Sequence, residues 1–251
     1  MRVLSRLGLL EDRRLISELE SCSTYSLLLD RNRFGLRSLS NPRSNDLSGF
    51  ILRGVAYMRD YMTLDYNRLD ALVCQYEHMA RFKEEISGGL SDVVPIQFLR
   101  LEKKMNSEPH FGNSVRRAGL SDFEELLTPY LSYCKEEIYP GLEGWEFSEK
   151  LRLKKFLKKK RYFILRKDGR IKSFLRISDS LADTVLVSSV YTIPDVRGHG
   201  LAKECIKQTI SILSQIRSFD LFVREENKIA QALFLSLGFE LKLHNAILYL
   251  K

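Results

Sequence analysis

The chain has 251 residues, a formal net charge of +8 and 44% hydrophobic residues. That length and apolar content suit a globular protein of one large domain or two ordinary ones. No stretch of about 18 uninterrupted apolar residues occurs, and Arg2 and Arg6 interrupt the apolar amino terminus, so neither a membrane span nor a secretory signal is predicted. We therefore expect a cytoplasmic protein without membrane contacts.

The amino-terminal part of the chain carries short apolar runs and one helical pattern. Apolar residues recur at helical spacing over 69–86, which predicts a helix there. The apolar runs are typical of strands, and they lie at 25–29, 50–57 and 61–66. We find no glycine-rich loop in this part.

A polar stretch at 103–113 interrupts the pattern and contains Pro109 and Gly112. We therefore expect a boundary here, between an amino-terminal α/β domain at 1–110 and a second domain at 113–251.

The second domain begins with a short strand at 114–118. The sequence Ser121-Asp-Phe-Glu124 has the form of a capping box, so a helix is expected to begin there. Another helix is predicted at 147–159, beyond Pro140 and Gly141.

A strand at 162–165 follows and ends at Lys167-Asp-Gly-Arg170. The Asp-Gly pair indicates a hairpin, whose return strand is expected at 171–177. Further elements are predicted by periodicity: a strand at 184–192, a helix at 201–216, a strand at 220–223, a helix at 228–237 and one or two strands at 240–250. The order β-α-α-β-β-β-α-β-α-β predicts a mixed α/β fold with helices on both faces of a sheet.

Basic residues are concentrated at 150–161, which holds eight Lys or Arg side chains and no acidic one. The simplest interpretation is a solvated helix face, although such a segment could also attract a polyanion. No aromatic interleaving of the type that binds single-stranded nucleic acid is obvious beyond Phe156 and Tyr162, so nucleic-acid binding is the least favoured hypothesis.

The cysteines show no metal-binding or disulfide spacing. We expect reduced core residues at all four positions, and no metal cofactor; they are Cys22, Cys74, Cys134 and Cys205.

The most informative stretch is 190–202, where a strand ends at Pro194 and a glycine-bearing turn opens a helix. The first turn of a helix offers unpaired N–H donors and the positive end of the helix dipole, so it can hold a diphosphate. Gly198 and Gly200 would let the backbone approach phosphates closely, and Arg197 adds a positive charge.

At these residues the chain resembles the GNAT superfamily of acyl-coenzyme A-dependent N-acyltransferases. The superfamily signature (Arg or Gln)-x-x-Gly-x-(Gly or Ala) is matched by Arg197-Gly-His-Gly200-Leu-Ala202. A second stretch, 221–239, resembles the superfamily's strand, asparagine, helix and Gly-Phe ending, with Asn227 as the asparagine. The sequence Val-Tyr-Thr-x-Pro at 190–194 further resembles superfamily members that carry an extra amino-terminal domain. In those members the extra domain is often a degenerate copy of the same fold.

The resemblance implies a site for acetyl-coenzyme A (acetyl-CoA). Backbone groups of Val190, Tyr191 and Thr192 would pair with the pantetheine arm, and a backbone N–H near Val190 could bind the thioester oxygen. The other residues expected to bind the cofactor are Arg197, Gly198, His199, Gly200, Leu201, Ala202, Lys203, Asn227 and Phe234.

The catalytic residues depart from the family pattern. Phe234 occupies the position where many members carry a tyrosine proposed to protonate the departing thiolate, and phenylalanine has no proton to give. Tyr191 is the candidate acid and Glu225 the candidate base. Other carboxylates remain open as bases, namely Glu136, Glu137, Glu143, Glu146 and Glu226.

The leading hypothesis is an acyltransferase that moves an acetyl group from acetyl-CoA to a primary amine. The alternative is an acyl-CoA sensor that keeps the cofactor loop without turnover, and Phe234 favours it. The acceptor could be a small molecule or a protein amine, and the sequence leaves a homodimer open.

Overall fold

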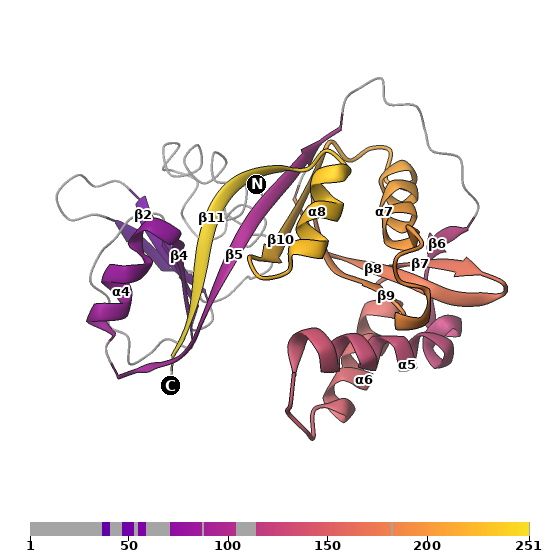
Figure 1. Cartoon of the computed structure of the whole chain (residues 1–251), viewed down its shortest axis with the longest axis horizontal. Helices are drawn as coiled ribbons and strands as arrows, with labels where there is room; N and C mark the ends of the chain where they lie inside the picture. The colour runs from indigo at the N-terminus through magenta and orange to yellow at the C-terminus, as the bar shows by residue number, and fades with distance from the viewer. Residues whose placement is uncertain are drawn as a thin grey trace. The chain divides into compact units, whose positions relative to one another are not determined.

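The structure is a computed structural model that describes residues 37–40, 47–52, 55–58, 71–86, 88–103, 114–181 and 183–250 (Figure 1). The chain forms two compact units. Unit 1 comprises Met1–Leu101, Asp179–Ala182 and Asp220–Lys251, and unit 2 comprises Glu102–Ser178 and Asp183–Phe219.

Unit 2 contains four adjacent strands in the order β9-β8-β7-β6. Their bounds are Val115–Arg117 (β6), Tyr162–Lys167 (β7), Arg170–Leu181 (β8) and Thr184–Thr192 (β9). Strand β7 is antiparallel to both β6 and β8. At the β7–β8 turn Asp168 and Gly169 have φ values of 52° and 73°. Positive φ at both turn residues is the geometry that an Asp-Gly hairpin favours, so the predicted hairpin is confirmed.

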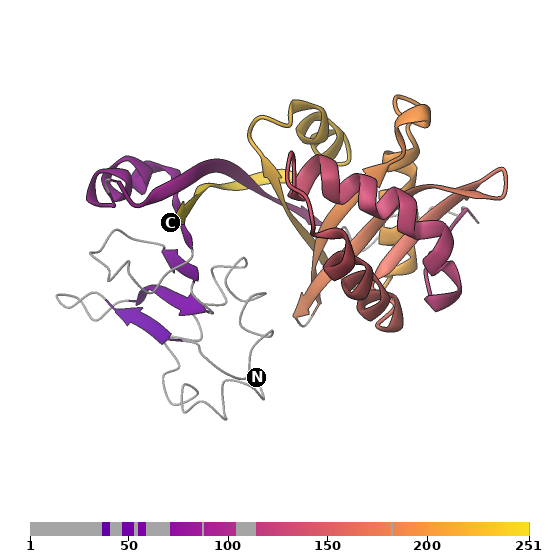
Figure 2. The ribbon, with the colours of Figure 1, turned by 90° about the horizontal axis from the view of Figure 1, so that it is seen from below.

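Two helices cover one face of these strands. They are α5 (Phe123–Tyr133), which follows a single 3-10 turn at Leu120–Asp122, and α6 (Glu146–Lys158). Seen from below, both helices lie across the strands (Figure 2). Buried side chains from the helices and the sheet share one core, including Leu126, Leu153 and Phe174.

The opposite face of the same strands is covered by α7 (Leu201–Ile212) (Figure 1). Its buried residues include Leu201, Cys205 and Ile206, which recur at helical spacing. Helices on both faces of the strands confirm the predicted mixed α/β architecture.

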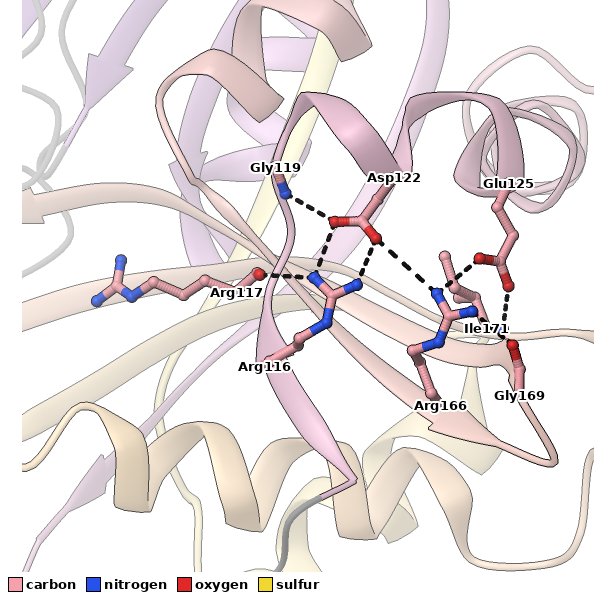
Figure 3. Close-up of polar contacts among 8 residues, drawn as sticks. All are labelled: Arg116, Arg117, Gly119, Asp122, Glu125, Arg166, Gly169 and Ile171. Carbon is pink, nitrogen blue, oxygen red and sulfur yellow. Dashed lines mark hydrogen bonds and ion pairs between the residues drawn. The ribbon is translucent and has the colours of Figure 1, made fainter.

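The start of α5 is joined to the β7–β8 hairpin by a network of charges (Figure 3). The buried Asp122 carboxylate accepts hydrogen bonds from the Arg116 guanidinium and from the Gly119 N–H. Arg166 donates to Glu125 at 2.6 Å, and Glu125 accepts the Ile171 N–H at 2.8 Å. The hairpin therefore has a defined position against α5.

Asp122 also corrects one prediction. A capping box was expected from Ser121 to Glu124. In the structure the side chain that binds a preceding backbone N–H is that of Asp122, which accepts the Gly119 N–H. The helical chain begins with the 3-10 turn at Leu120–Asp122, and the α-helix follows from Phe123.

Unit 1 contains strands in the order β1-β2-β3-β4-β11-β5-β10. The bounds are Arg37–Ser40 (β1), Leu47–Leu52 (β2), Val55–Met58 (β3), Ala71–Gln75 (β4), Leu90–Glu102 (β5), Ser218–Arg224 (β10) and Glu240–Leu250 (β11). The helices α4 (Met79–Glu85) and α8 (Lys228–Ser236) belong to the same unit. Strand β11 is antiparallel to β4 on one side and to β5 on the other.

Strands β5 and β10 are linked by a buried ion pair. The Arg100 guanidinium donates to both carboxylate oxygens of Asp220, from Nε to Oδ1 at 2.7 Å and from Nη2 to Oδ2 at 2.8 Å. The Asp220 side chain is 0% exposed. A carboxylate this deeply buried is stable only with such a partner.

The helix predicted over 69–86 is wrong in its first half. Ala71–Gln75 is strand β4, and only Met79–Glu85 is α-helical, after a 3-10 turn at Tyr76–His78. Leu72 and Cys74 are fully buried in the core with Ala246 and Leu248. A short apolar run fits a buried strand and a buried helix equally well, so its partners in the sheet decided the outcome.

The other predicted elements behave as follows. The strand expected at 50–57 is two antiparallel strands, β2 and β3, and the strands expected at 25–29 and 61–66 lie outside the described residues. From residue 114 onward the predicted order of strands and helices is confirmed, with a single closing strand.

Cys74, Cys134 and Cys205 are buried free thiols, and burial raises the pKa of each to about 12. Cys22 lies outside the described residues. In the described part of the chain no cluster of at least three His, Cys, Asp or Glu side chains could hold a metal. No helix there is long and apolar enough to span a membrane.

The basic segment 150–161 lies mainly on α6. Leu153 and Leu157 are buried, whereas the Lys and Arg side chains of the helix are exposed. This is the amphipathic arrangement expected of a solvated helix face.

Candidate functional site

The glycine-bearing turn after β9 has the geometry expected for anion binding. Strand β9 is followed by a 3-10 turn at Pro194–Val196, and α7 begins at Leu201. Gly198 and Gly200 have φ values of 80° and 75°, in the left-handed region that side chains rarely adopt. We call residues 193–203 the phosphate loop.

Backbone donors of the phosphate loop are available to a ligand. Within the described part of the chain, none of the N–H groups at 198–203 donates to a protein acceptor. The first N–H after them that does so belongs to Glu204 and donates to the Gly200 carbonyl at 3.0 Å. Six successive unpaired donors at the positive end of a helix form a ready site for a diphosphate.

Side chains add positive charge to this turn. His199 is exposed and Lys203 half-buried, and neither side chain has a hydrogen bond or ion pair with any described residue. Arg197 is already engaged, because its Nη2 donates to Glu136 Oε2 at 2.7 Å and its Nε donates to the Thr192 carbonyl at 3.0 Å.

Tyr191 is part of the same cluster. Its ring is buried, and its hydroxyl donates to Glu136 Oε1 at 2.6 Å. Burial and the hydrogen bond to Glu136 raise the pKa of Tyr191 to about 12. Because its proton is directed at Glu136, Tyr191 could act as an acid only after exchanging that contact for one with the leaving sulfur.

Strand β9 is irregular just before Val190. Ser189 has a φ of 50°, which is uncommon for a residue with a side chain and marks a local distortion of the strand. The Tyr191 carbonyl accepts from Ser173 Oγ at 2.8 Å, and the Thr192 carbonyl accepts from Arg197. A carbonyl oxygen has two lone pairs, so these two bonds from side chains do not by themselves prevent either oxygen from accepting a further bond.

A cavity of about 560 Å³ opens beside Tyr191, within unit 2. Pro194 and Ile193, from the phosphate loop, contribute to one wall, and α5 and the β7–β8 turn contribute the rest. Its volume is in the range of ligand pockets. The Arg166 side chain in the wall is paired with Glu125, whereas the side chain of Arg170 has no hydrogen bond or ion pair with any described residue.

Three further predicted site residues belong to unit 1. Asn227 caps α8, and its side-chain oxygen accepts the Ala230 N–H at 3.0 Å. Phe234 is buried against Phe239 with ring centroids 5.7 Å apart. Glu225 Oε2 lies 3.2 Å from His244 Nε2.

Sequence reasoning missed how Glu136 is used. It was one of several candidate bases, but its carboxylate binds both Tyr191 and Arg197. It lies in a π-helical turn at Cys134–Ile138 that continues α5. Such turns often occur at functional sites, yet no residue pattern in this stretch announces one.

Comparison with known proteins agrees with this fold. Residues 120–239 match the model of the Acetyltransferase (GNAT) family. No curated protein matches the chain.

Solved structures with the same fold include three bacterial proteins. A protein described as a GNAT-family acetyltransferase from Novosphingobium aromaticivorans is 21% identical over 64% of this chain and 66% of its own, with a TM-score of 0.50. A GCN5-related N-acetyltransferase from Sphaerobacter thermophilus is 13% identical over 86% of this chain and 80% of its own, with a TM-score of 0.56. A functionally unknown protein from Staphylococcus epidermidis is 11% identical over 84% of this chain and 94% of its own, with a TM-score of 0.61.

These structural likenesses concern the fold, whereas the family match covers the strands, helices and loop from which the candidate site is built. Residues 120–239 therefore form a domain of the GNAT acetyltransferase family.

Proposed function

We propose that the protein is an N-acetyltransferase that moves the acetyl group of acetyl-CoA to a primary amine by direct attack in a ternary complex. The observation that carries the proposal is the row of unpaired N–H groups at 198–203, at the start of α7. A diphosphate is the part of CoA that such a row would bind. Lys203 would add a positive charge and His199 a further contact, from side chains that have no partner among the described residues.

The thioester would lie along the end of β9. Backbone groups of Val190, Tyr191 and Thr192 would pair with pantetheine, and the distortion at Ser189 supports this because it departs from a regular strand just before Val190. A backbone N–H near Val190 would stabilise the oxyanion of the tetrahedral intermediate. Leu201 and Ala202 would contribute their N–H groups to the diphosphate.

The amine must lose a proton before it attacks the thioester. We propose Glu225 as the base, with His244 as its hydrogen-bonded partner. Thiolate departure needs little assistance, since a thiol has a pKa of about 8.5. Phe234 at the usual tyrosine position is therefore compatible with turnover.

A second candidate function is an acyl-CoA sensor without turnover. Phe234 favours it, because its buried ring carries no acidic proton. Tyr191 favours it too, since its hydroxyl proton is directed to Glu136.

The test combines binding with turnover. Calorimetric titration with acetyl-CoA should show one site per chain, and a panel of primary amines should release free thiol from acetyl-CoA. Binding without thiol release for any amine favours the sensor. No binding of acetyl-CoA contradicts both functions.

A further inference from the structure

Glu136 connects three parts of unit 2 through one carboxylate. It lies in the π-helical turn Cys134–Ile138, after α5. Its Oε1 accepts the Tyr191 hydroxyl at 2.6 Å, and its Oε2 accepts Arg197 Nη2 at 2.7 Å. The end of a helix, the end of β9 and the phosphate loop therefore meet at this side chain.

Arg197 is held on three sides. Besides the bond to Glu136, its Nε donates to the Thr192 carbonyl at 3.0 Å, and its Cζ lies 5.1 Å from the centre of the Tyr191 ring. These two hydrogen bonds occupy one edge of the planar guanidinium and leave its other N–H groups available. A guanidinium fixed in this way loses less conformational entropy when it binds a phosphate.

The carboxylate has the charge this role requires. Burial opposes ionisation, but hydrogen bonds from Tyr191 and Arg197 outweigh it and lower the pKa of Glu136. At neutral pH Glu136 is therefore ionised and accepts both hydrogen bonds as a charged group.

We propose that Glu136 is a positioning residue for cosubstrate binding: it holds Arg197 and Tyr191 so that the phosphate loop keeps the shape that receives the CoA diphosphate. This inference rests on the proposed function. It makes a counterintuitive prediction, since a negative charge near a diphosphate site should by Coulomb's law alone weaken binding. If Glu136 positions Arg197, removing that charge weakens binding instead.

The positioning role can be separated from a general role in folding. The side chains of Arg197 and Glu136 are 48% and 39% exposed. Ion pairs this exposed contribute little to global stability. The loss of Glu136 should therefore appear in CoA affinity and hardly in the melting temperature.

The experiment measures the Kd of coenzyme A by calorimetry for the full chain and its variants. Glu136→Ala should raise the Kd about tenfold, the change that about 1.4 kcal/mol produces. Glu136→Gln keeps the length of the side chain and can accept the Tyr191 hydroxyl, so it should lose less. Glu124→Gln is the matched control, because it removes one charge from α5 at an exposed side chain without a partner among the described residues. Its Kd should stay within about twofold of the parent.

A double-mutant cycle tests whether Glu136 affects the Kd of coenzyme A through Arg197. If Glu136 acts through Arg197, then Glu136→Ala should change the Kd by less than about twofold in an Arg197→Met background. Unchanged or tighter binding by Glu136→Ala overturns the inference, as does an equal loss in both backgrounds. If Glu136→Ala does not fold, the isosteric Glu136→Gln decides by the same cycle. Failure of the parent chain to bind coenzyme A overturns the proposed function, and this inference with it.

Discussion

The turn at Gly198 allows backbone strain to be separated from ligand contact. Gly198 has a φ of 80°, and a Cβ added there meets no atom within 4 Å. Gly144, in the loop before α6, has a φ of 81° and also meets no atom within 4 Å. Alanine at either position thus has the same strain and no clash, but only Gly198 lies in the phosphate loop.

The expected magnitudes follow from this match. An L-residue in the left-handed region costs about 1–2 kcal/mol, so Gly198→Ala and Gly144→Ala should destabilise the protein equally. For a chain of this size each kcal/mol lowers the melting temperature by about 2–4 °C. At Gly198 the new methyl would also stand where the diphosphate approaches. Losing two charge-assisted bonds of about 1.5 kcal/mol each would weaken CoA binding about 100-fold.

The assay is thermal unfolding without ligand, followed by calorimetric titration with coenzyme A. Gly198→Ala and Gly144→Ala should melt within about 2 °C of each other. Only Gly198→Ala should lose affinity. If Gly198→Ala binds coenzyme A within about threefold of the parent, the diphosphate does not lie on this loop and the argument fails.

Three further predictions concern stability and chemistry. Asp122→Asn should lower the free energy of unfolding, measured in urea at pH 7, by about 2 kcal/mol. The loss is smaller than for a fully buried ion pair because the partner Arg116 is only half-buried. Arg116 holds the pKa of Asp122 below its usual value of 3.8, so this difference in stability should be full above pH 3.8 and shrink as the pH falls below it. Equal differences at pH 7 and pH 2 would contradict the pairing. Tyr191→Phe should remove a phenol that titrates near pH 12 in ultraviolet difference spectra. Because the pKa of Tyr191 in the folded protein is raised from 10.0, the stability that the phenol contributes is complete below pH 10 and is lost as the pH rises through about 12. Titration of Tyr191 near pH 10 would refute the contact with Glu136. If the protein turns over as proposed, with unaided departure of the thiolate, Phe234→Tyr should leave kcat for any accepted amine within about threefold. A tenfold rise would show that protonation of the thiolate limits the rate.

Much of the fold from residue 114 onward could be predicted because local signals agreed with tertiary packing. The Asp168-Gly169 turn needs two residues that tolerate positive φ, and the sequence supplies them. The α7 start follows a proline and two glycines, and its buried face has helical spacing. Such signals depend only on neighbours in the chain.

The elements that escaped prediction depend on distant partners. Leu72 and Cys74 lie in a strand because β3 and β11 pair with it on either side, and no local pattern reveals that. Glu136 meets Arg197 across 61 positions of the chain. Ser189 has a positive φ without the glycine or asparagine that usually marks one.

The candidate site was predicted in part. The glycines of the phosphate loop have positive φ values, but the binding and catalytic roles of all the predicted site residues stay predictions. The predicted division into 1–110 and 113–251 concerns which segments fold alone, and it also stays a prediction.

Strand β11 pairs with a strand on each side, and this matters for the design of fragments of the protein. Its neighbours β4 and β5 both precede residue 103, although β11 ends at Leu250. In a fragment beginning at 113, both edges of β11 would lack their partner strands. The buried Asp220 carboxylate would also lack its ion-pair partner Arg100. Supplying residues 1–110 as a separate polypeptide should therefore rescue such a fragment, in the manner of a split enzyme whose halves complement each other.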